Sequence, residues 1–388
     1  MKQQFGLKTE VSSIRKLLIN FLTSNTGGVI NFKKDVIKHI DHNAKDFEFE
    51  IYCLVSVEAE KQIGTLKNIK YCRGLDIPKS FIKKILFYER KLEGLVKIHN
   101  IDIVLNFGDI PANVSAKQIF YFDWPYAVYD DFKIWSRLRF QDLGSKLVKR
   151  LYFKLTNDRL EHYVVQTNTM KKRLSAKIKN RPISVIDVGF NEEESKKTNC
   201  SVIDTPKSLK PTLIYPTIMY AHKNVEILLS VAKLLKAQNF EATFELTFSE
   251  NSGKKESRFI KSVKKHGLSD YFSFLGRLSR NSLVQKVKSS TAIIMPTLIE
   301  TYGLPYLEAQ LFEKVMFTSD RDFAREICGD SAIYFDPNNA ADIAEKIVEN
   351  ILSESRMSKH IMATNVERAK RVSWTESTRR FLETATLV

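Results

Sequence analysis

Two carboxylates, Glu300 and Glu308, flank a short segment whose residue types suit phosphate binding. An apolar run ends at Pro296, Glu300 follows in a predicted loop, and Gly303 allows a tight turn there. Pro305 then falls in the first turn of a predicted helix, where its missing N–H costs nothing. The N–H groups of a helix start attract phosphate, and Glu308 in the same turn could accept hydrogen bonds from ribose hydroxyls. The segment therefore predicts a nucleotide-phosphate site, although Glu308 taken alone also fits a merely favourable acidic first turn.

A diphosphate could be contacted from two other parts of the chain. Gly27 and Gly28 lie between a predicted strand and a predicted helix, so the backbone there can approach a phosphate or an acceptor closely. Lys223 stands near a predicted helix start with His222 beside it, and the two side chains could neutralise phosphates as point charges. An ordinary Gly-Gly turn and a solvated lysine remain the alternatives at these positions.

Other acidic residues allow more than one interpretation. Asp123, within the segment Ile119–Tyr126, could bind a sugar hydroxyl and orient an acceptor, or cap the turn that follows. Asp320 and Asp322 have the spacing of a metal-binding acidic pair, but they follow a predicted strand and precede a short helix. Helix capping by Asp322 or Ser319 is therefore favoured. Because the four cysteines are scattered and form no Cys-x-x-Cys pair, the sequence predicts no metal site.

The elements that must position these residues alternate along the whole chain. The predicted strands are Leu17–Leu22, Phe47–Val55, Asn68–Cys72, Ile101–Phe107, Gln118–Phe122, Tyr163–Gln166, Ile183–Val188, Pro211–Pro216, Ala242–Phe248, Tyr271–Leu275, Ala292–Pro296, Val315–Ser319 and Ala332–Phe335. The predicted helices include Val29–Ile40, Pro78–Ile98, His222–Ala237 and the stretch from Ala340 onward. This alternation predicts an α/β protein with parallel sheets covered by helices on both faces. Ligands of such sheets bind at the carboxyl ends of the strands.

The composition is that of a folded globular protein, with 43% hydrophobic and 27% charged residues. The length of 388 residues is comfortable for two domains, and the polar stretch Asn191–Asn199 is interpreted as a loop near their linker. No apolar run reaches the roughly 18 residues of a membrane span, and Leu17–Leu22 is interpreted as a strand instead of a signal-peptide core. The scattered cysteines indicate reduced thiols of a cytosolic protein.

The net charge of +16 indicates an anionic partner, which could be nucleic acid, anionic lipid or a phosphorylated small molecule. A lysine-rich surface kept soluble by repulsion is the alternative. Two basic runs, Ser145–Lys154 and Lys171–Arg181, lack acidic residues. In the first run Leu147, Leu151 and Leu155 recur at helical spacing with cations between them. This pattern predicts either a membrane-surface helix or an amphipathic helix that packs one face on a core.

The segment Glu-Thr-Tyr-Gly-Leu-Pro-Tyr-Leu-Glu at 300–308 resembles the donor-site signature of the family 4 retaining glycosyltransferases, which have the GT-B fold. Further segments resemble other motifs of that family in the same order along the chain. They are Thr26–Val29, Val185–Phe190, His222–Asn224, Phe274–Arg277, Gly329–Ala332, Phe335–Pro337 and Ser373–Trp374. The resemblance is strong over Leu213–Val388 and collinear over the first half.

The resemblance implies a GT-B architecture, in which two Rossmann-like domains face each other across a cleft and a C-terminal helix returns to the first domain. The implied limits are 1–195 for an N-terminal acceptor-side domain, 196–370 for a C-terminal nucleotide-sugar-binding domain and 371–388 for the helix. The implied reaction is retaining transfer of a hexose from a nucleoside-diphosphate sugar to a saccharide acceptor, itself lipid-linked, in surface polysaccharide biosynthesis.

Residue roles follow from the same resemblance. Glu300 would position the transferred sugar, and Asp123 would lie on the acceptor side. The implied donor contacts are Gly27, Gly28, His222, Lys223, Arg277, Tyr302, Gly303, Leu304 and Glu308. No metal or cofactor is implied, since the sugar nucleotide is a substrate and the helix dipole with Lys223 would stabilise the leaving group. The implied partners are donor and acceptor, with a peripheral contact to anionic lipid at the inner face of the cytoplasmic membrane, and no nucleic acid.

Two positions depart from the family pattern. Relatives place an Arg five residues before the diphosphate lysine, where this chain has Ile218, and they often carry a His near the position of Asp123. Either His222 or Arg277 compensates for the missing Arg, or the donor is bound more weakly. The alternatives are another GT-B enzyme such as a phosphorylase or sugar-nucleotide epimerase, a catalytically silent homologue, and a nucleic-acid-binding protein suggested by charge alone.

Overall fold

The structure is a computed structural model that describes residues 14–22, 29–73, 80–108, 110–189, 210–352 and 373–388. The chain divides into two compact units. Unit 1 comprises Met1–Tyr121, Thr156–Tyr163 and Thr378–Val388, and unit 2 comprises Phe122–Leu155 and Val164–Ser377. The predicted domain limits at 195/196 and 370/371 lie outside the described residues and stay a prediction.

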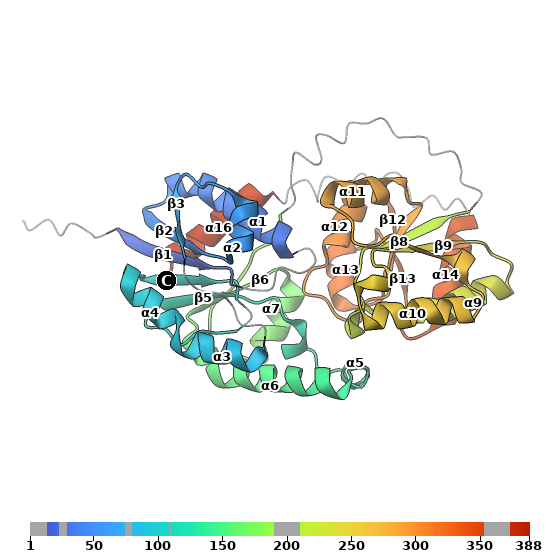
Figure 1. Cartoon of the computed structure of the whole chain (residues 1–388), viewed down its shortest axis with the longest axis horizontal. Coiled ribbons are helices and arrows are strands. Elements are labelled where there is room, and N and C mark those ends of the chain that lie inside the picture. The colour runs from blue at the N-terminus through green and yellow to red at the C-terminus, as the bar shows by residue number, and fades with distance from the viewer. Residues whose placement is uncertain (1–13, 23–28, 74–79, 109, 190–209, 353–372) are drawn as a thin grey trace, which may run out of the picture. The chain divides into compact units, whose positions relative to one another are not determined.

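The first sheet has seven strands in the order β3-β2-β1-β4-β5-β6-β7 (Figure 1). The strands are β1 (Arg15–Asn20), β2 (Phe49–Leu54), β3 (Ile69–Cys72), β4 (Ile103–Asn106), β5 (Lys117–Tyr121), β6 (His162–Val165) and β7 (Ile183–Val185). The helices that lie between β1 and β7 in the sequence are α1 (Val29–Asn43), α2 (Val57–Ile63), α3 (Phe81–Arg90), α4 (Leu92–His99), α5 (Phe132–Trp135), α6 (Phe140–Thr156) and α7 (Asn168–Ser175). The pairs β1–β2, β1–β4, β2–β3 and β4–β5 are parallel. All the strands predicted for this half are confirmed, with small shifts at their ends.

The second sheet has six strands in the order β10-β9-β8-β11-β12-β13, and all of its pairs are parallel. The strands are β8 (Thr212–Tyr215), β9 (Thr243–Leu246), β10 (Phe272–Phe274), β11 (Ala292–Met295), β12 (Val315–Ser319) and β13 (Ile333–Phe335). The helices that follow β8 in the chain are α9 (Ile227–Ala237), α10 (Lys254–Lys265), α11 (Arg280–Ser289), α12 (Leu304–Leu311), α13 (Asp322–Cys328), α14 (Ala340–Leu352) and the C-terminal α16 (Trp374–Thr386). The predicted strands are again confirmed.

Both sheets share the doubly wound order of a Rossmann fold. The first strand of each half, β1 or β8, lies at the centre beside the fourth, β4 or β11. These strands form because their sequences are almost continuously apolar, as parallel strands covered on both faces require. Every residue of β11 is buried, as are Leu17, Leu18 and Ile19 of β1. The strand order reverses between β8 and β11, so the loops that follow these two strands flank the crevice where such sheets bind ligands.

Two predicted helices have different limits in the structure. The predicted helix Pro78–Ile98 is broken at Lys91, which ends α3 and begins α4. The predicted helix His222–Ala237 begins only at Ile227, because Asn224 has φ 54° in the left-handed region and a helix cannot continue through it.

The C-terminal helix α16 packs on unit 1. Asn43 Nδ2 donates a hydrogen bond to Thr378 Oγ1 at 3.0 Å, and the Phe381 ring meets Phe107 and Tyr121 edge-on, with ring centroids 5.2 and 5.8 Å away. Figure 1 shows α16 beside α1. The predicted return of this helix to the first domain is confirmed. Among the described helices, none is long and apolar enough to cross a membrane.

Candidate functional site

The start of α12 has the turn that the sequence predicted from Gly303 and Pro305. Gly303 is the N-cap with φ 91°, a conformation that L side chains rarely adopt, and Pro305 follows in the first turn. A Cβ on Gly303 would lie 2.7 Å from the buried Tyr306 ring, so no larger residue fits without movement. The glycine therefore lets the chain turn sharply from the loop after β11 into the helix, where Pro305 has no N–H and the Tyr306 N–H donates to the Gly303 carbonyl at 3.0 Å.

Glu308, on the second turn of α12, is buried and half-satisfied. Its Oε1 atom pairs with Arg280 at the start of α11, while Oε2 is buried without a hydrogen-bond partner. Only 5% of its side chain is exposed. A buried carboxylate oxygen without a donor is costly, so Oε2 is a polar atom suited to accept a hydrogen bond from a ligand.

Lys223 and Glu300 form an ion pair between the two loops at the switch point. Lys223 ends a short 3₁₀ turn, Ala221–Lys223, after β8, and Glu300 lies in the loop after β11. Their side chains are 19% and 12% exposed, so the pair is largely shielded from water. Two sequence-predicted residues that lie far apart in the chain are thus brought together at the carboxyl ends of adjacent strands.

Asn224 fixes the loop that carries Lys223. Its side-chain amide donates to the carbonyls of Pro296 at 3.0 Å and Pro337 at 2.7 Å, and Arg137 donates to its side-chain oxygen. The Lys223 carbonyl also accepts a hydrogen bond from the buried Tyr215 hydroxyl at 2.9 Å. These contacts hold the backbone at Lys223 in place independently of the ion pair.

His222 connects the site to α6. The His222 Nδ1 atom lies 3.2 Å from the Tyr126 hydroxyl, and Lys146 of α6 places its Nζ 4.0 Å from the centre of the Tyr126 ring. Burial, with the nearby charges of Lys223 and Lys146, lowers the pKa of His222 well below its ordinary value. At neutral pH the imidazole is therefore uncharged, and it acts as a hydrogen-bonding group and not as a second cation.

The remaining predicted contacts vary in their position. Tyr302 is buried and Leu304 is 38% exposed, both at the start of α12. Arg277 and Asp123 are exposed. Gly27 and Gly28 lie outside the described residues.

Three residues near the site were missed from the sequence. Arg280 pairs with Glu308, and Tyr126 with Lys146 adjoins His222. Arg280 lies three residues beyond Arg277 and could have been weighed as a second basic candidate. Lys146 lies in one of the two basic runs, but the sequence alone does not indicate which of its cations points toward an aromatic ring.

The acidic pair Asp320 and Asp322 does not gather ligands for a metal. Asp320 pairs with Arg325, and Asp322 pairs with Arg173 and accepts a hydrogen bond from the Tyr129 hydroxyl at 3.0 Å. The predicted cap is only partly right, because the N-cap is Arg321 and Asp322 is the first helical residue, bonding the Phe323 N–H. Among the described residues no cluster of His, Cys, Asp and Glu could hold a metal ion.

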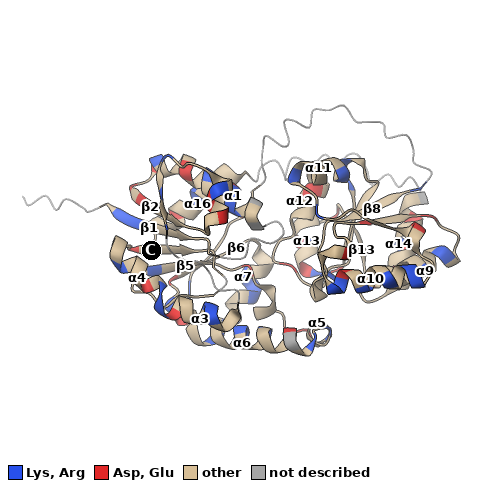
Figure 2. Cartoon of the chain, viewed as in Figure 1, with Lys and Arg blue, Asp and Glu red and all other residues tan. Residues whose placement is uncertain are grey.

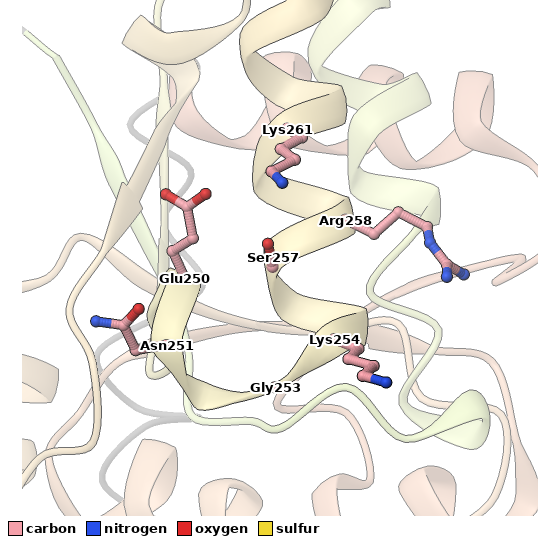
Figure 3. Close-up of a pocket in the computed structure, with 7 residues that line it drawn as sticks. All are labelled: Glu250, Asn251, Gly253, Lys254, Ser257, Arg258 and Lys261. Atoms are coloured by element: carbon pink, nitrogen blue, oxygen red, sulfur yellow. The ribbon is translucent and has the colours of Figure 1, made fainter.

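A shallow hollow of about 590 Å³ lies elsewhere on unit 2, between the turn Glu250–Ser252 and α10. In Figure 3, Glu250 and Asn251 lie across from Ser257 and Lys261, while Arg258 points away. Its lining contains none of the predicted site residues. The candidate site is therefore taken to be the loops after β8 and β11, which carry the buried ion pair, together with α12, which carries the unpartnered carboxylate oxygen.

The two doubly wound parallel sheets with a returning C-terminal helix define the GT-B fold. A glycosyltransferase from Rickettsia africae superimposes with a TM-score of 0.66 at 18% identity, covering 96% of this chain and 98% of that chain. Anabaena HepE in complex with UDP-glucose superimposes with a TM-score of 0.67 at 13% identity, covering 96% of this chain and 100% of that chain.

Sequence comparison adds the kind of domain. Residues 203–368 match the family model described as glycosyl transferases group 1, so this segment is a glycosyltransferase group 1 domain. The chain is also 24% identical to O-antigen chain mannosyltransferase B of Escherichia coli over 165 residues, which are 42% of this chain. The match spans 43% of that relative, less than half its length.

Proposed function

We propose that this chain is a retaining, family 4-like hexosyltransferase that moves a sugar from a nucleoside-diphosphate donor to a saccharide acceptor. The observation that carries the proposal is the buried, unpartnered Oε2 of Glu308 beside a glycine-capped helix start. A ribose hydroxyl would satisfy that oxygen while the diphosphate lies against the start of α12. The group 1 match over residues 203–368 and the HepE complex with UDP-glucose support a sugar nucleotide as the ligand.

The donor is held by side chains from both switch-point loops. Lys223 neutralises charge on the departing diphosphate, and the dipole at the start of α12 stabilises it. Tyr302, Gly303 and Leu304 form the turn against which the phosphates rest. Glu300 positions the transferred sugar, with His222 as an uncharged hydrogen-bonding neighbour.

The acceptor hydroxyl attacks on the face from which the diphosphate departs, so configuration at the anomeric carbon is retained. Charge develops on the leaving diphosphate, where the helix dipole and Lys223 stabilise it without a metal ion. Asp123, Arg277, Gly27 and Gly28 keep the acceptor-side and donor-side roles that the family resemblance implies. No cofactor takes part, because the sugar nucleotide is consumed as a substrate.

The acceptor is a lipid-linked saccharide in surface polysaccharide assembly. The partial match to an O-antigen mannosyltransferase supports this setting. Such an acceptor would be met at the cytoplasmic face of a membrane, which this chain would reach through a peripheral contact.

Helix α6 supplies that contact. Five large apolar side chains on it are exposed: Phe140 (93%), Leu147 (49%), Val148 (48%), Leu151 (57%) and Leu155 (68%). At 3.6 residues per turn they form one stripe, opposite the buried Phe153. Figure 2 shows Lys and Arg recurring along the same helix. An apolar stripe flanked by cations fits the boundary of an anionic lipid surface.

The test begins with a panel of sugar nucleotides, scored by thermal stabilisation of the purified protein. Turnover of the stabilising donor is then measured for Glu300→Gln and Glu308→Gln, with Glu345→Gln as a control because Glu345 is exposed on α14. Loss of turnover in the first two variants alone supports the site. If both retain wild-type turnover and donor affinity, the assignment is wrong; hydrolysis or phosphorolysis of the donor without acceptor would indicate another GT-B reaction.

A further inference from the structure

The proposed donor site has little net positive charge to offset the negative charge of a diphosphate. Lys223 is already paired with Glu300, and Arg280 with Glu308. His222 is uncharged at neutral pH because burial lowers its pKa. Ile218, where the family pattern has an Arg, contributes no charge. A diphosphate arriving here would meet two cations, Lys223 and Arg280, that are largely neutralised by their own carboxylates.

Lys146 is a nearby cation whose charge is not neutralised in this way. It is half-buried, with its Nζ over the Tyr126 ring, and within the described residues no carboxylate forms an ion pair with it. Asp142, whose charge acts on Lys146, is itself paired with Lys255 at 3.2 Å. Holding an ammonium group in a partly dehydrated place without a counter-ion costs free energy, and a ligand anion would offset that cost.

The position of Lys146 connects it with the donor loop. Tyr126, only 2% exposed, stacks under the ammonium group with its ring and reaches His222 with its hydroxyl. His222 is adjacent to Lys223 in the chain, and the positive charge of Lys146 helps to lower the pKa of its imidazole. The three side chains thus form a continuous path from α6 to the loop after β8.

We propose that Lys146 Nζ binds an oxygen of a substrate diphosphate beside His222, supplying the cation that Ile218 lacks. This inference rests on the proposed function, since it assumes a diphosphate-bearing substrate. Two sources share that chemistry: the nucleoside diphosphate of the donor and the diphosphate of a lipid-linked acceptor. The aromatic ring of Tyr126 holds the ammonium group in position while leaving its N–H donors available to phosphate.

The experiment is titration calorimetry on the full chain, with two arms that separate the sources. UDP and GDP are titrated into the free protein, and inorganic pyrophosphate is then titrated into protein saturated with whichever nucleotide binds. Lys146→Met keeps an unbranched apolar side chain over Tyr126, and Lys146→Arg keeps the charge. Lys154→Met, at an exposed position of the same helix, removes an equal charge as the control.

Lys146→Met is expected to weaken one arm about 10-fold or more, as loss of a charge-assisted phosphate contact does. Lys146→Arg should restore most of that affinity, and Lys154→Met should match the wild type. Loss in the nucleotide arm assigns the subsite to the donor, and loss only in the pyrophosphate arm assigns it to the acceptor. Wild-type affinity of Lys146→Met in both arms would overturn the inference. Failure of the wild type to bind either nucleotide would instead contradict the proposed function, and the effect of Lys146→Met on pyrophosphate binding alone would then decide the subsite.

Discussion

Lys223 and Glu300 are joined by an ion pair although 77 residues separate them in the sequence. The pair exists because β8 and β11 lie side by side, so the loops at their carboxyl ends meet. Both side chains are largely buried, and breaking such a pair leaves one charge without a partner. In the proposed function a diphosphate and Glu300 therefore compete for the same ammonium group, so a change at Glu300 should affect nucleotide affinity and turnover differently.

Glu300→Gln is expected to lower turnover at least about 100-fold while leaving UDP or GDP affinity unchanged or tighter. The amide cannot neutralise Lys223, so the lysine is freed to bind phosphate, but the transferred sugar loses its carboxylate contact. Calorimetry with the free nucleotide and steady-state kinetics with the full donor measure the two effects separately. A parallel fall of nucleotide affinity and turnover would assign Glu300 a different role.

Glu308→Gln tests the ribose contact directly. Loss of the carboxylate should weaken UDP binding about 10-fold, because hydrogen bonds to charged acceptors contribute about 1.5–3 kcal/mol. A 2′,3′-dideoxy analogue of UDP lacks the hydroxyls, so wild type and Glu308→Gln should bind it equally. Since Glu308 also pairs with Arg280, the unfolding midpoint of each variant is measured alongside. An equal loss for both nucleotides would show that the carboxylate acts through Arg280 and not through the ribose.

Gly303→Ala should disturb the start of α12. The position has φ 91°, and a methyl group would lie 2.7 Å from a Tyr306 ring held by a hydrogen bond to Thr318. We expect a loss of about 1–3 kcal/mol in unfolding free energy, with weaker nucleotide binding. Gly94→Ala in α4 is the control, since a Cβ there meets nothing within 4 Å and should stabilise by about 0.5–1 kcal/mol. Urea unfolding of the three proteins measures the difference, and equal stability of Gly303→Ala and wild type would refute the strain.

The sequence predicted the strands and the turn at Gly303 because both leave local patterns. Buried parallel strands are short apolar runs, and Gly303 with Pro305 marks a turn entering a helix. The pairing of Arg280 with Glu308 leaves no such pattern, since nothing periodic links residues that meet only through the fold. For α6 the sequence left two alternatives open. The exposure of Leu151 and its neighbours shows that this leucine face does not pack on the core.

The affinity for diphosphate should fall as the pH rises through about 8. Burial, with repulsion from Lys149 and Lys255, lowers the pKa of Lys146 to about 8, against the opposing effect of Asp142. The contacting groups Tyr126 and His222 bring no negative charge at neutral pH. Because phosphate binds the charged lysine, protein titrated above that pH binds more weakly, and Lys146→Met should lose this dependence. Calorimetry between about pH 7 and pH 9 tests it, and an unchanged slope in the variant would remove Lys146 as the cause.

The same pKa makes a matching prediction for stability. The folded-state pKa lies below the ordinary value of 10.5, so the unfolded chain binds more protons between these values. The unfolding free energy of the wild type should therefore rise relative to Lys146→Met as the pH goes from about 8 to about 10.5. Urea titrations of both proteins across that window measure the difference. If the difference in unfolding free energy between the two proteins did not change with pH, Lys146 would have the same pKa in the folded and unfolded states.

Binding to lipid should depend on the apolar stripe of α6 and on anionic headgroups together. The double change Leu151→Glu with Leu155→Glu places two carboxylates in the stripe, where both leucines are more than half exposed, 57% and 68%. Little native packing is lost, so the variant should fold normally but fail to sediment with vesicles of phosphatidylcholine and phosphatidylglycerol. The matched control is Val57→Glu with Ile98→Glu, which adds the same charge at exposed positions of α2 and α4. We expect the control to sediment with the mixed vesicles like the wild type. Neither the control nor the wild type should sediment with vesicles of phosphatidylcholine alone at moderate salt. Equal sedimentation of both double variants would show that attraction between the basic chain and the vesicle acts without α6, and the helix would then lose its assigned role.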